Sequence, residues 1–304
     1  MKFFKHFALT LFISIRCLAM TPPPAVEGGS VVVLDAHDGN ILYSKNPNER
    51  RPVGSTQKLL TALVVVDRGN LDHMVTIEPF DEHTEPTMLN LKPGESYSRE
   101  QLLTALLVKS PNDVARALAR DEAGSLENFV ELMNQKAASL GATSSHFVNP
   151  NGLPAPGQYS TASDMGKFAL AVYHTPLLRS IIATKYFPFH YANGNTGLLE
   201  NTNHTMRDNP FCNGMKTGYT DKSKHCLLSS GSYAGRDIIV VILGSEHRKR
   251  LFDDSAELLR WGLGLPPSTK HFMTMIHHSK TSSEVIPQKH HRKKRFKKRV
   301  TGSE

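Results

Sequence analysis

The chain has 304 residues, 39% of them apolar and 21% charged, so it can bury a sizeable core, which excludes a wholly disordered chain. Its three cysteines are too few for a small disulfide-stapled scaffold. The formal charge of +8 belongs to residues 266–304, which hold ten Lys and Arg against two acidic residues, so the neutral body gives no reason to expect nucleic acid as a partner.

The first twenty residues have the pattern of a secretory signal peptide. Two lysines precede an apolar run at residues 7–15, which is too short to span a bilayer as a helix, and small residues stand before a cut after Ala19. A buried N-terminal helix is the alternative. We expect a signal peptide at residues 1–19 and a linker at residues 20–29, which predicts export to the periplasm or the cell-envelope exterior.

The body of the chain, residues 30–265, opens with two predicted elements. Residues 31–35 and 41–44 are predicted to form a β-hairpin around an Asp-Gly-Asn turn. A helix is predicted for residues 55–68, because its apolar residues recur at helical spacing and Gly69 provides a stop.

Helices fill the middle of the body and strands return at its end. Further helices are predicted after a capping box at residues 98–101 and at residues 113–123, 126–140 and 161–173. Two strands and a helix close the body, at residues 226–232, 237–244 and 252–261. Because strands stand at both ends, we expect an α+β fold, in which an antiparallel sheet is assembled from both ends, flanked by helices, with a helical lobe inserted between.

Some segments carry simpler expectations. Asn213-Gly214 has the composition of a turn, and the acidic residues around Asp81 are expected in a solvated loop. Cys212 and Cys226 either form a disulfide or stand as two separate thiols, and their spacing does not decide between the two. Neither a metal nor a cofactor is expected, because the chain contains no His-Glu-x-x-His or Cys-x-x-Cys spacing.

Ser55 and Lys58 stand at the start of a predicted helix. Residues three apart lie on one helical face, so the lysine amine can reach the serine hydroxyl. A serine hydroxyl is a poor nucleophile that needs a neighbouring base, and a lysine with a lowered pKa can serve as one. The alternative is an N-capping serine with a surface lysine, which this motif alone does not exclude.

Two more motifs follow along the chain. Ser110-Pro-Asn112 lies between two predicted helices, and its alternative reading is a helix break with Asn112 as N-cap. Lys216-Thr217-Gly218 precedes the late strands, where the glycine would let a substrate backbone lie close; its alternative reading is an edge-strand lysine with a bulge glycine. Each motif is weak alone, but the three together in this order indicate one catalytic site.

With these motifs, residues 26–265 resemble the serine D-Ala-D-Ala carboxypeptidases, the low-molecular-weight penicillin-binding proteins related to class A β-lactamases. Further family-like stretches lie at residues 147–154, 159–165, 214–220 and 258–262. The resemblance implies a β-lactamase/DD-peptidase-like fold. It also implies a carboxypeptidase that removes the terminal D-alanine from peptidoglycan stem peptides ending in D-Ala-D-Ala, with β-lactams as covalent inhibitors.

The resemblance assigns a role to each motif residue. Ser55 would attack the carbonyl between the two D-alanines and form an acyl-enzyme, and Lys58 would take its proton. Ser110, helped by Lys216, would pass a proton towards the leaving amine. Asn112 would hold Lys58 and the substrate amide.

The resemblance also implies how the substrate is held. The backbone N–H groups of Ser55 and Tyr219 would form the oxyanion hole, which stabilises charge as it develops. Thr217 and an arginine near the last helix would bind the terminal carboxylate of the peptide. Arg250 is our choice for that arginine and Arg248 the substitute, because the local alignment is ambiguous by a residue or two.

The sequence departs from the family pattern at several positions. Gln57 stands where the family usually has Thr, and Pro111 stands where it usually has Gly or another small residue. Pro111 is expected to stiffen the loop that places Ser110 and Asn112. Few residues follow Trp261, so the small β-rich C-terminal domain and the amphipathic membrane anchor of many members are not expected.

Three other functions remain open. An endopeptidase that cuts D-alanine cross-links would carry the same motifs. A class A β-lactamase would have a glutamate about 36 residues past Ser110, where Ser145, His146 and Phe147 stand instead, so slow release of a bound penicillin is expected. A non-catalytic binder would keep the fold and work through the basic tail.

The tail at residues 266–304 is expected to be disordered, because like charges at this density repel each other. An anionic membrane or an acidic wall polymer is the partner that its charge favours. Such a contact would place the protein peripherally on the membrane.

Overall fold

The computed structural model describes residues 22–82 and 84–269, so the expected signal peptide and most of the basic tail lie outside the described residues. The chain divides into two units, Met1–Leu265 and Pro266–Glu304. The strands are β1 (Ser30–Asp35), β2 (Ile41–Lys45), β3 (Met74–Thr76), β4 (Ser96–Ser98), β5 (Tyr186–His190), β6 (Thr196–Glu200), β7 (Cys212–Thr220), β8 (Lys224–Tyr233) and β9 (Arg236–Ser245). The helices are α1 (Lys58–Arg68), α2 (Arg99–Val108), α3 (Asn112–Ala123), α4 (Leu126–Ser139), α5 (Ala162–His174), α6 (Pro176–Ile182), α7 (Thr205–Asp208) and α8 (Arg248–Leu263), with 3-10 turns η1 (Gly54–Gln57) and η2 (Pro79–Asp81).

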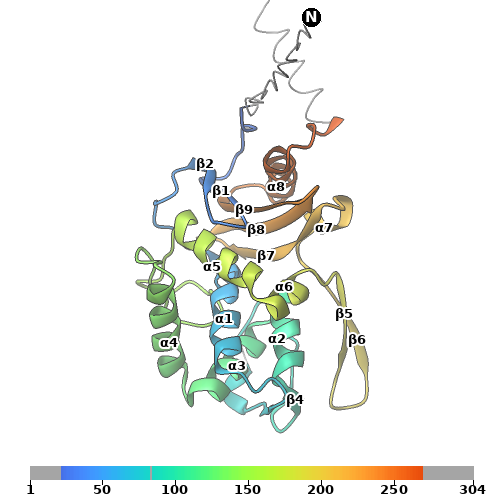
Figure 1. The fold of residues 1–304 in the computed structure, drawn as a ribbon. Helices are drawn as coiled ribbons and strands as arrows, with labels where there is room; N and C mark the ends of the chain where they lie inside the picture. Colours follow the sequence, from blue (N-terminus) through green and yellow to red (C-terminus); the bar gives the residue numbers. More distant parts are fainter. Residues whose placement is uncertain (1–21, 83, 270–304) are drawn as a thin grey trace, which may run out of the picture. The chain divides into compact units, whose positions relative to one another are not determined.

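A five-stranded antiparallel sheet in the order β2-β1-β9-β8-β7 forms the centre of the first unit (Figure 1). β1, from the start of the body, pairs along its whole length with β9, from the end of the body. This pairing confirms a sheet assembled from both ends. β7 stands at one edge of the sheet, so one side of its backbone is free to meet another extended chain.

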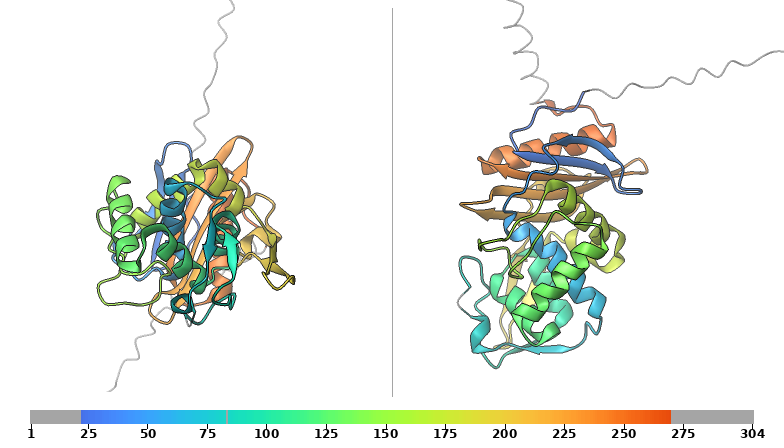
Figure 2. Two further views of the ribbon diagram at one scale, coloured as in Figure 1. Left: turned by 90° about the horizontal axis from the view of Figure 1, so that it is seen from below. Right: turned by 90° about the vertical axis from the view of Figure 1, so that its left-hand side faces the viewer.

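Helices cover both faces of the sheet, as Figure 2 shows from the side. α8 packs on one face, while α5 and the helical lobe cover the other. Successive side chains of β1 alternate between two cores, with Val31 and Val33 on the α8 side and Val32 and Leu34 on the lobe side. A strand covered on both faces is apolar throughout, which explains the unbroken run that marked β1 in the sequence.

The chain between β2 and β7 contains the helical lobe, which confirms the predicted insertion. α1 runs through the lobe and packs against α2, α3, α4 and α5, with all residues from Lys58 to Val65 buried. The turn η1 that precedes it contacts β7. The start of α1 therefore lies where the lobe meets the edge of the sheet.

Three local predictions need correction. The helix expected from residue 55 begins as the turn η1 and becomes α-helical only at Lys58. Asn112 is not an N-cap, because Pro111 occupies that position and Asn112 is the first helical residue. Asn213-Gly214 lies inside β7, where the pairing with β8 shifts between Cys212 and Gly214; a bulge in an edge strand has the composition of a turn.

The structure also contains short elements that the sequence did not predict. The hairpins β3–β4 and β5–β6 and the helices α6 and α7 were missed. Strands of three residues give too little periodicity to detect, and a proline inside β5 argues against a strand. Part of the expected linker is docked rather than free, because the Glu27 backbone N–H donates to Asp254 Oδ2 at 2.8 Å.

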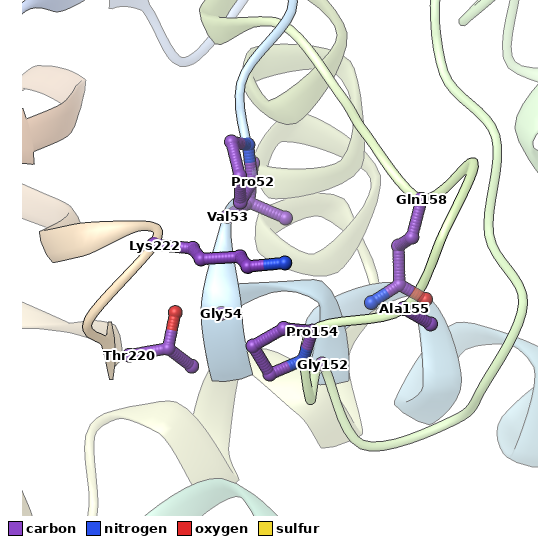
Figure 3. A pocket seen from close by; sticks show the side chains of 9 residues that line it. All are labelled: Pro52, Val53, Gly54, Gly152, Pro154, Ala155, Gln158, Thr220 and Lys222. Atoms are coloured by element: carbon purple, nitrogen blue, oxygen red, sulfur yellow. The ribbon is translucent and has the colours of Figure 1, made fainter.

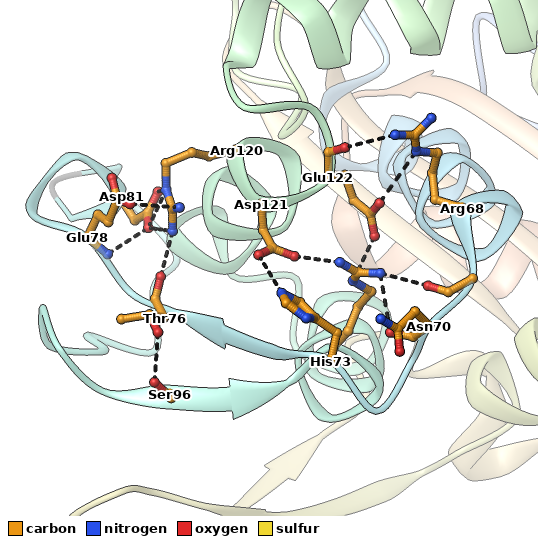
Figure 4. Close-up of polar contacts among 12 residues, drawn as sticks. Arg68, Asn70, His73, Thr76, Glu78, Asp81, Ser96, Arg120, Asp121 and Glu122 are labelled. Carbon is orange, nitrogen blue, oxygen red and sulfur yellow. Dashed lines mark hydrogen bonds and ion pairs between the residues drawn. The ribbon is translucent and has the colours of Figure 1, made fainter.

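Asp81 is fully buried, which corrects the expectation of a solvated loop around it. Its carboxylate pairs with Arg120, whose Nη2 lies 2.9 Å from Asp81 Oδ2 (Figure 4). The same guanidinium donates to the Thr76 carbonyl oxygen at 2.6 Å. Arg120 thus joins α3 to the segment that runs from β3 through η2.

The two described cysteines are separate buried thiols, which decides between the alternatives left by the sequence. Cys212 lies in the core on the α8 side of the sheet and Cys226 in the core on the lobe side. The sheet separates them, so a disulfide between them would require rebuilding the fold. Across residues 22–82 and 84–269, no helix has both the length and the apolar character needed to cross a membrane.

Candidate active site

The motif residues meet where four segments converge: the start of α1, the α2–α3 junction, the loop at residues 149–152 and the edge strand β7. Close backbone approach makes this possible. A Cβ atom on Gly218 would lie 2.9 Å from Ser55 N, and one on Gly152 would lie 2.2 Å from the Gly54 carbonyl oxygen. Side chains at either glycine would therefore push β7 or the loop away from η1.

Ser55 and Lys58 are within hydrogen-bond distance, as the sequence predicted. Lys58 Nζ lies 2.8 Å from Ser55 Oγ, 2.7 Å from Asn112 Oδ1 and 2.7 Å from the Asn151 carbonyl oxygen. The lysine side chain is completely buried, so the alternative of a surface lysine is wrong. Asn112 holds Lys58, as the resemblance implied.

The surroundings of Lys58 decide the direction of its hydrogen bonds. Two of its three partners, Asn112 Oδ1 and the Asn151 carbonyl, can only accept. A neutral amine has two N–H groups and one lone pair, so its N–H groups go to these acceptors. In this neutral state the lone pair faces the Ser55 hydroxyl, the only partner of the three that can donate a proton, whereas the charged amine donates to Ser55 Oγ as well.

Electrostatics favour that neutral amine. Burial lowers the pKa of Lys58 well below the ordinary lysine value, and the nearby Lys216 ammonium lowers it further, while Asp113 raises it. Burial also lowers the pKa of Lys216, to about 7. Both lysines are completely buried, and neither forms an ion pair with an acidic residue in the described part of the chain.

A loop fixes the Asn151 carbonyl beside Lys58. Three successive carbonyl oxygens of this loop accept hydrogen bonds from the first two turns of the helix: Asn149 from Gln57 Nε2 at 2.5 Å, Pro150 from Thr61 Oγ1 at 2.7 Å and Asn151 from Lys58 Nζ. Gln57, a departure from the family pattern, thus anchors the loop. Sequence analysis missed Asn151 because a backbone carbonyl leaves no signal in residue type.

Ser110 has an unusual backbone conformation. Its φ of +72° lies in the left-handed region, although a non-glycine residue before proline favours extended backbone. Its Oγ is buried and has no hydrogen-bond partner among the described residues. Pro111, with φ −68°, follows and starts α3, which places Asn112 against Lys58. A strained residue with an unsatisfied buried hydroxyl is typical of a functional position.

The strand β7 carries the remaining motif. Thr217 Oγ1 donates to Thr202 Oγ1 at 2.6 Å, and Lys216 Nζ donates to the Thr217 carbonyl oxygen at 3.1 Å. Gly54 and Tyr219 are also close, since a Cβ on Gly54 would lie 3.2 Å from Tyr219 N. Ser55 N belongs to the first turn of η1, where N–H groups lack helical acceptors. The two N–H groups expected in an oxyanion hole therefore come from adjoining segments.

The structure places the two candidate arginines in different surroundings. Arg250 Nε lies 2.9 Å from Asp254 Oδ1, on the side of α8 that receives the Glu27 backbone. Arg248 points elsewhere, with Nη2 3.3 Å from His204 Nε2. Because a helix turns about 100° per residue, positions 248 and 250 face nearly opposite directions, and a shift of two residues in an alignment selects a different surface.

A segment that sequence analysis missed connects Arg248 to the motifs. Thr202 N donates to the carbonyl of Val108, at the end of α2, and Thr202 Oγ1 accepts from Thr217. Two residues later, His204 contacts Arg248 and stacks on Phe252, with ring centroids 5.0 Å apart. The Asn-Thr-Asn-His sequence, with its Asx-turn residues, was the available signal.

A pocket lies beside Gly54, the neighbour of Ser55, between Val53, Pro154 and Lys222 (Figure 3). It is lined by Pro52, Val53, Gly54, Gly152, Pro154, Ala155, Gln158, Thr220 and Lys222. Within residues 22–82 and 84–269, no group of three or more His, Cys, Asp or Glu side chains is arranged to hold a metal ion.

Comparisons with known proteins place this geometry in context. The profile of the peptidase S11 family, described as D-alanyl-D-alanine carboxypeptidase, matches residues 18–247. The chain is 34% identical over 251 residues to the D-alanyl-D-alanine carboxypeptidase DacB2 of Mycobacterium tuberculosis, covering 81% of this chain and 86% of that protein. It is 32% identical over 270 residues to the D-alanyl-D-alanine endopeptidase of Pseudomonas aeruginosa, covering 83% and 86%. The crystal structure of a D-alanyl-D-alanine carboxypeptidase from Mycobacterium tuberculosis H37Rv matches with a TM-score of 0.77 and 32% identity, covering 83% of this chain and 96% of that one.

Proposed function

Because the chain belongs to the peptidase S11 family of serine DD-peptidases that act on peptidoglycan, we propose that it is a D-Ala-D-Ala carboxypeptidase working through an acyl-enzyme. Its fold is the β-lactamase/DD-peptidase-like fold that the sequence predicted. The observation that carries the proposal is the buried Lys58 amine, 2.8 Å from Ser55 Oγ and bounded otherwise by acceptors.

Acylation begins with the Ser55–Lys58 pair. Ser55 Oγ attacks the carbonyl between the two D-alanines while its proton passes to the Lys58 lone pair. The oxyanion that forms accepts hydrogen bonds from the backbone N–H groups of Ser55 and Tyr219. These donors are fixed before the reaction, so they stabilise the developing charge without reorganisation.

Collapse of the tetrahedral intermediate breaks the bond to the terminal D-alanine. The leaving amine needs a proton, which Lys58 supplies through the Ser110 hydroxyl, with Lys216 supporting the relay. The otherwise unsatisfied Ser110 Oγ gains partners in this step. Lys58 is neutral again afterwards and can activate the water that hydrolyses the acyl-enzyme.

The terminal carboxylate of the peptide needs cationic and hydroxyl partners at the start of the motif on β7. Thr217 Oγ1 provides the hydroxyl, and Arg248 replaces Arg250 as the cation. Thr202 contacts Thr217, and His204 contacts Arg248, so one short segment holds both groups. A terminal D-alanine presents a carboxylate next to the scissile bond, which this pair of groups would hold. The muropeptide comparison described below separates this reaction from cleavage of a cross-link.

β-Lactams should acylate the same serine and leave slowly. The loop facing Ser55 presents the Asn151 carbonyl, while Ser145 and His146 are held elsewhere, by Asp164 and by the Gly157 carbonyl. None of these three groups is a carboxylate that could activate a deacylating water as in a class A β-lactamase.

Export and a membrane contact belong to the same proposal. A DD-peptidase meets peptidoglycan outside the cytoplasmic membrane, which agrees with the signal-peptide pattern at residues 1–19. The basic residues of the tail favour an anionic membrane or wall polymer as a partner. Binding of full-length and tail-deleted mature protein to anionic vesicles, at low and high salt, tests this part separately.

The first experiment is intact-protein mass after exposure of the mature chain to benzylpenicillin, with Ser55→Ala as control. We expect a long-lived adduct on the wild type alone. Folded wild-type protein without an adduct would contradict the proposal and favour a non-catalytic binder. Release of D-alanine from monomeric and cross-linked muropeptides then compares carboxypeptidase with endopeptidase activity, and faster cleavage of the cross-link would reverse our choice.

A further inference from the structure

The pocket beside Ser55 has apolar walls and one charged group. Its walls include Pro52, Val53, Pro154 and Ala155. The ammonium of Lys222 reaches into the space between Val53 and Pro154, as Figure 3 shows. Such walls accept an aliphatic chain, and the ammonium calls for an anion at the end of that chain.

Lys222 lies in the turn between β7 and β8, where its neighbours have partners and it has none among the described residues. On one side of it, the Asp221 carboxylate accepts from the Tyr219 hydroxyl at 3.0 Å. On the other, Lys224 pairs with Glu246 at 3.4 Å. Lys222 itself has no ion pair or hydrogen bond with any residue in the described ranges, so its charge is available to a ligand.

Gln158 adds a directed N–H group to the same pocket. Its Oε1 accepts from the backbone N–H groups of Val148 and Asn149, at 3.1 and 3.2 Å. One N–H of its Nε2 goes to the Leu153 carbonyl oxygen at 2.8 Å, which fixes the amide. The second Nε2 hydrogen is left over, and Nε2 lies on the side of the amide that faces Pro154 in Figure 3.

The position of the pocket follows from the register of β7. A peptide that adds to the free edge of β7 in the antiparallel sense has its carboxyl end at Thr217 and its scissile bond at Gly218, opposite Ser55. Thr220, which lines the pocket, is three residues beyond Thr217 along β7. At about 3.3 Å per residue, that distance of roughly 10 Å is the span of three peptide residues. The pocket therefore meets the residue that precedes D-Ala-D-Ala.

We propose that this pocket binds the side chain of the residue before D-Ala-D-Ala and selects one that ends in a carboxylate. This inference rests on the proposed peptidase function and names its substrate class: stem peptides with a diamino dicarboxylic acid, such as meso-diaminopimelate, at that position. The aliphatic part lies against the prolines, and the carboxylate meets Lys222 Nζ and the free N–H of Gln158. A lysine side chain at the same place would bring its ammonium towards Lys222 without the carboxylate that offsets this repulsion in the dicarboxylic acid.

The test uses three acetylated tripeptides that differ only at one terminal group: acetyl-X-D-Ala-D-Ala, where X is meso-diaminopimelate, its side-chain carboxamide or L-lysine. We expect kcat/KM for D-alanine release to be about five- to tenfold higher for the dicarboxylic acid than for its carboxamide, as for one partly exposed charge-assisted hydrogen bond. L-lysine should rank with or below the carboxamide. Equal values for all three in the wild type would overturn the inference.

Variants in the turn between β7 and β8 test whether Lys222 is the group that recognises the carboxylate. Lys222→Met should reduce the ratio between the dicarboxylic peptide and its carboxamide to about one, while Lys222→Arg should keep most of it. Lys224→Met removes one positive charge from the same turn and should leave the ratio at its wild-type value. A ratio that survives in Lys222→Met, or falls equally in Lys224→Met, would contradict the assignment to Lys222.

Binding to Ser55→Ala separates this inference from the proposed function. Calorimetry with the three tripeptides measures the preference without hydrolysis, and we expect the same order. A preference without turnover in the wild type would leave the pocket in place and contradict the peptidase. A penicillin adduct on Ser55 without any preference would do the reverse.

Discussion

The protein contains two sets of buried basic side chains, one without acidic partners and one paired with carboxylates. Lys58 and Lys216 are completely buried beside Ser55 and, in the described part of the chain, face no acidic ion-pair partner. Arg99, also buried, lies on the far side of the lobe between two carboxylates. Its Nη2 is 2.7 Å from Asp121 Oδ2, and its Nε is 2.7 Å from Glu122 Oε1, an ion pair without hydrogen-bond geometry.

The paired cations connect elements of the lobe, as Figure 4 shows for Arg120 and Asp81. Arg99 also donates to the Gly69 carbonyl oxygen at 2.7 Å, so it ties the start of α2 to the end of α1 and to α3. Nearby, Arg120 ties α3 to Asp81. Burial lowers the pKa of Arg120, but its pairing with Asp81 and Glu78 outweighs burial and raises that pKa above its ordinary value.

The paired arginines contribute to stability, and the unpaired lysines are suited to reactivity. A paired charge repays part of its desolvation cost and holds helices together. Burial without an acidic partner lowers the pKa of a lysine instead, which fits Lys58 for the role of base that we propose beside Ser55. Four predictions test this contrast, from the largest expected effect to the smallest.

Lys58→Met tests the unpaired set and should give the largest effect. Removing a general base costs about 10²- to 10⁴-fold in rate, so acylation by benzylpenicillin should slow by that factor. The melting temperature should change little, because the desolvation cost of the buried amine disappears together with its hydrogen bonds to Asn112 and the Asn151 carbonyl. Stopped-flow acylation and thermal unfolding measure the two. An acylation rate within tenfold of wild type would mean that another group takes the proton.

Arg99→Met tests the paired set. It should lower the free energy of unfolding and leave the acylation rate close to wild type. It leaves Asp121 and Glu122 without their buried partner, which should cost about 3–5 kcal/mol of unfolding free energy. Arg68→Met is the matched control, because the Arg68 side chain is 54% exposed and lies 3.8 Å from Glu122, so about 1 kcal/mol or less is expected.

Urea unfolding measures both arginine variants, and penicillin acylation per folded molecule provides the second readout. Arg99→Met should acylate at a rate close to wild type, since the ion pairs lie away from Ser55. Equal losses of stability in the two variants would show that the burial of Arg99 does not matter.

The pH profile of acylation tests the coupling between the two unpaired lysines. The reaction needs neutral Lys58, so the rate should fall as the pH drops through its pKa. The pKa of Lys58 is lowered by burial and by Lys216 and raised by Asp113. Lys216→Met removes the repelling charge, which raises the pKa of Lys58 and should move the acid limb to higher pH. A shift to lower pH would contradict the coupling.

The protonation or substitution of His204 should have the smallest effect on activity, because His204 acts only through Arg248. Burial, Arg207 and Arg248 lower the pKa of His204, against Glu200 and Asp208, which raise it, so the neutral ring can accept from Arg248 at neutral pH. Below that pKa the ring gains a charge and repels the guanidinium. KM for peptides should therefore rise at acidic pH more than kcat falls.

His204→Ala should raise KM about three- to tenfold at neutral pH, the loss of one exposed hydrogen bond to a charged group, and remove the His204 part of the acid dependence. His204→Gln, which can still accept, should restore most of the neutral-pH KM. A purely structural role would instead lower kcat and stability together, without this split between KM and kcat.

The Ser55–Lys58 pair could be predicted because the two residues are close together in the sequence. Ser55 and Lys58 lie one turn apart, so helical geometry alone brings them together. The order of the three motifs supplied Ser110, Asn112 and Lys216, whose roles in catalysis stay predictions. The β1–β2 hairpin and most helices followed from short-range periodicity, for the same reason.

The rest depended on contacts between distant parts of the chain. The Asn151 carbonyl reaches Lys58 across 93 positions, and His204 selects Arg248 across 44. Neither contact has a periodic signal, because it depends on how loops and helices pack. Arg248 and Arg250 have different partners although they are two residues apart, because a helix turns about 100° per residue, and nothing in the sequence indicated those partners.

The amino-acid sequence by itself determined the family, the α+β architecture and the serine–lysine pair, since each follows from residue type and spacing along the chain. The tertiary structure decided which charges stay charged. Lys58 and Arg99 are both buried basic side chains, and only the packing of the 149–152 loop and α3 places acceptors around one and carboxylates around the other. A pKa depends on such neighbours in space, and these are set by the fold.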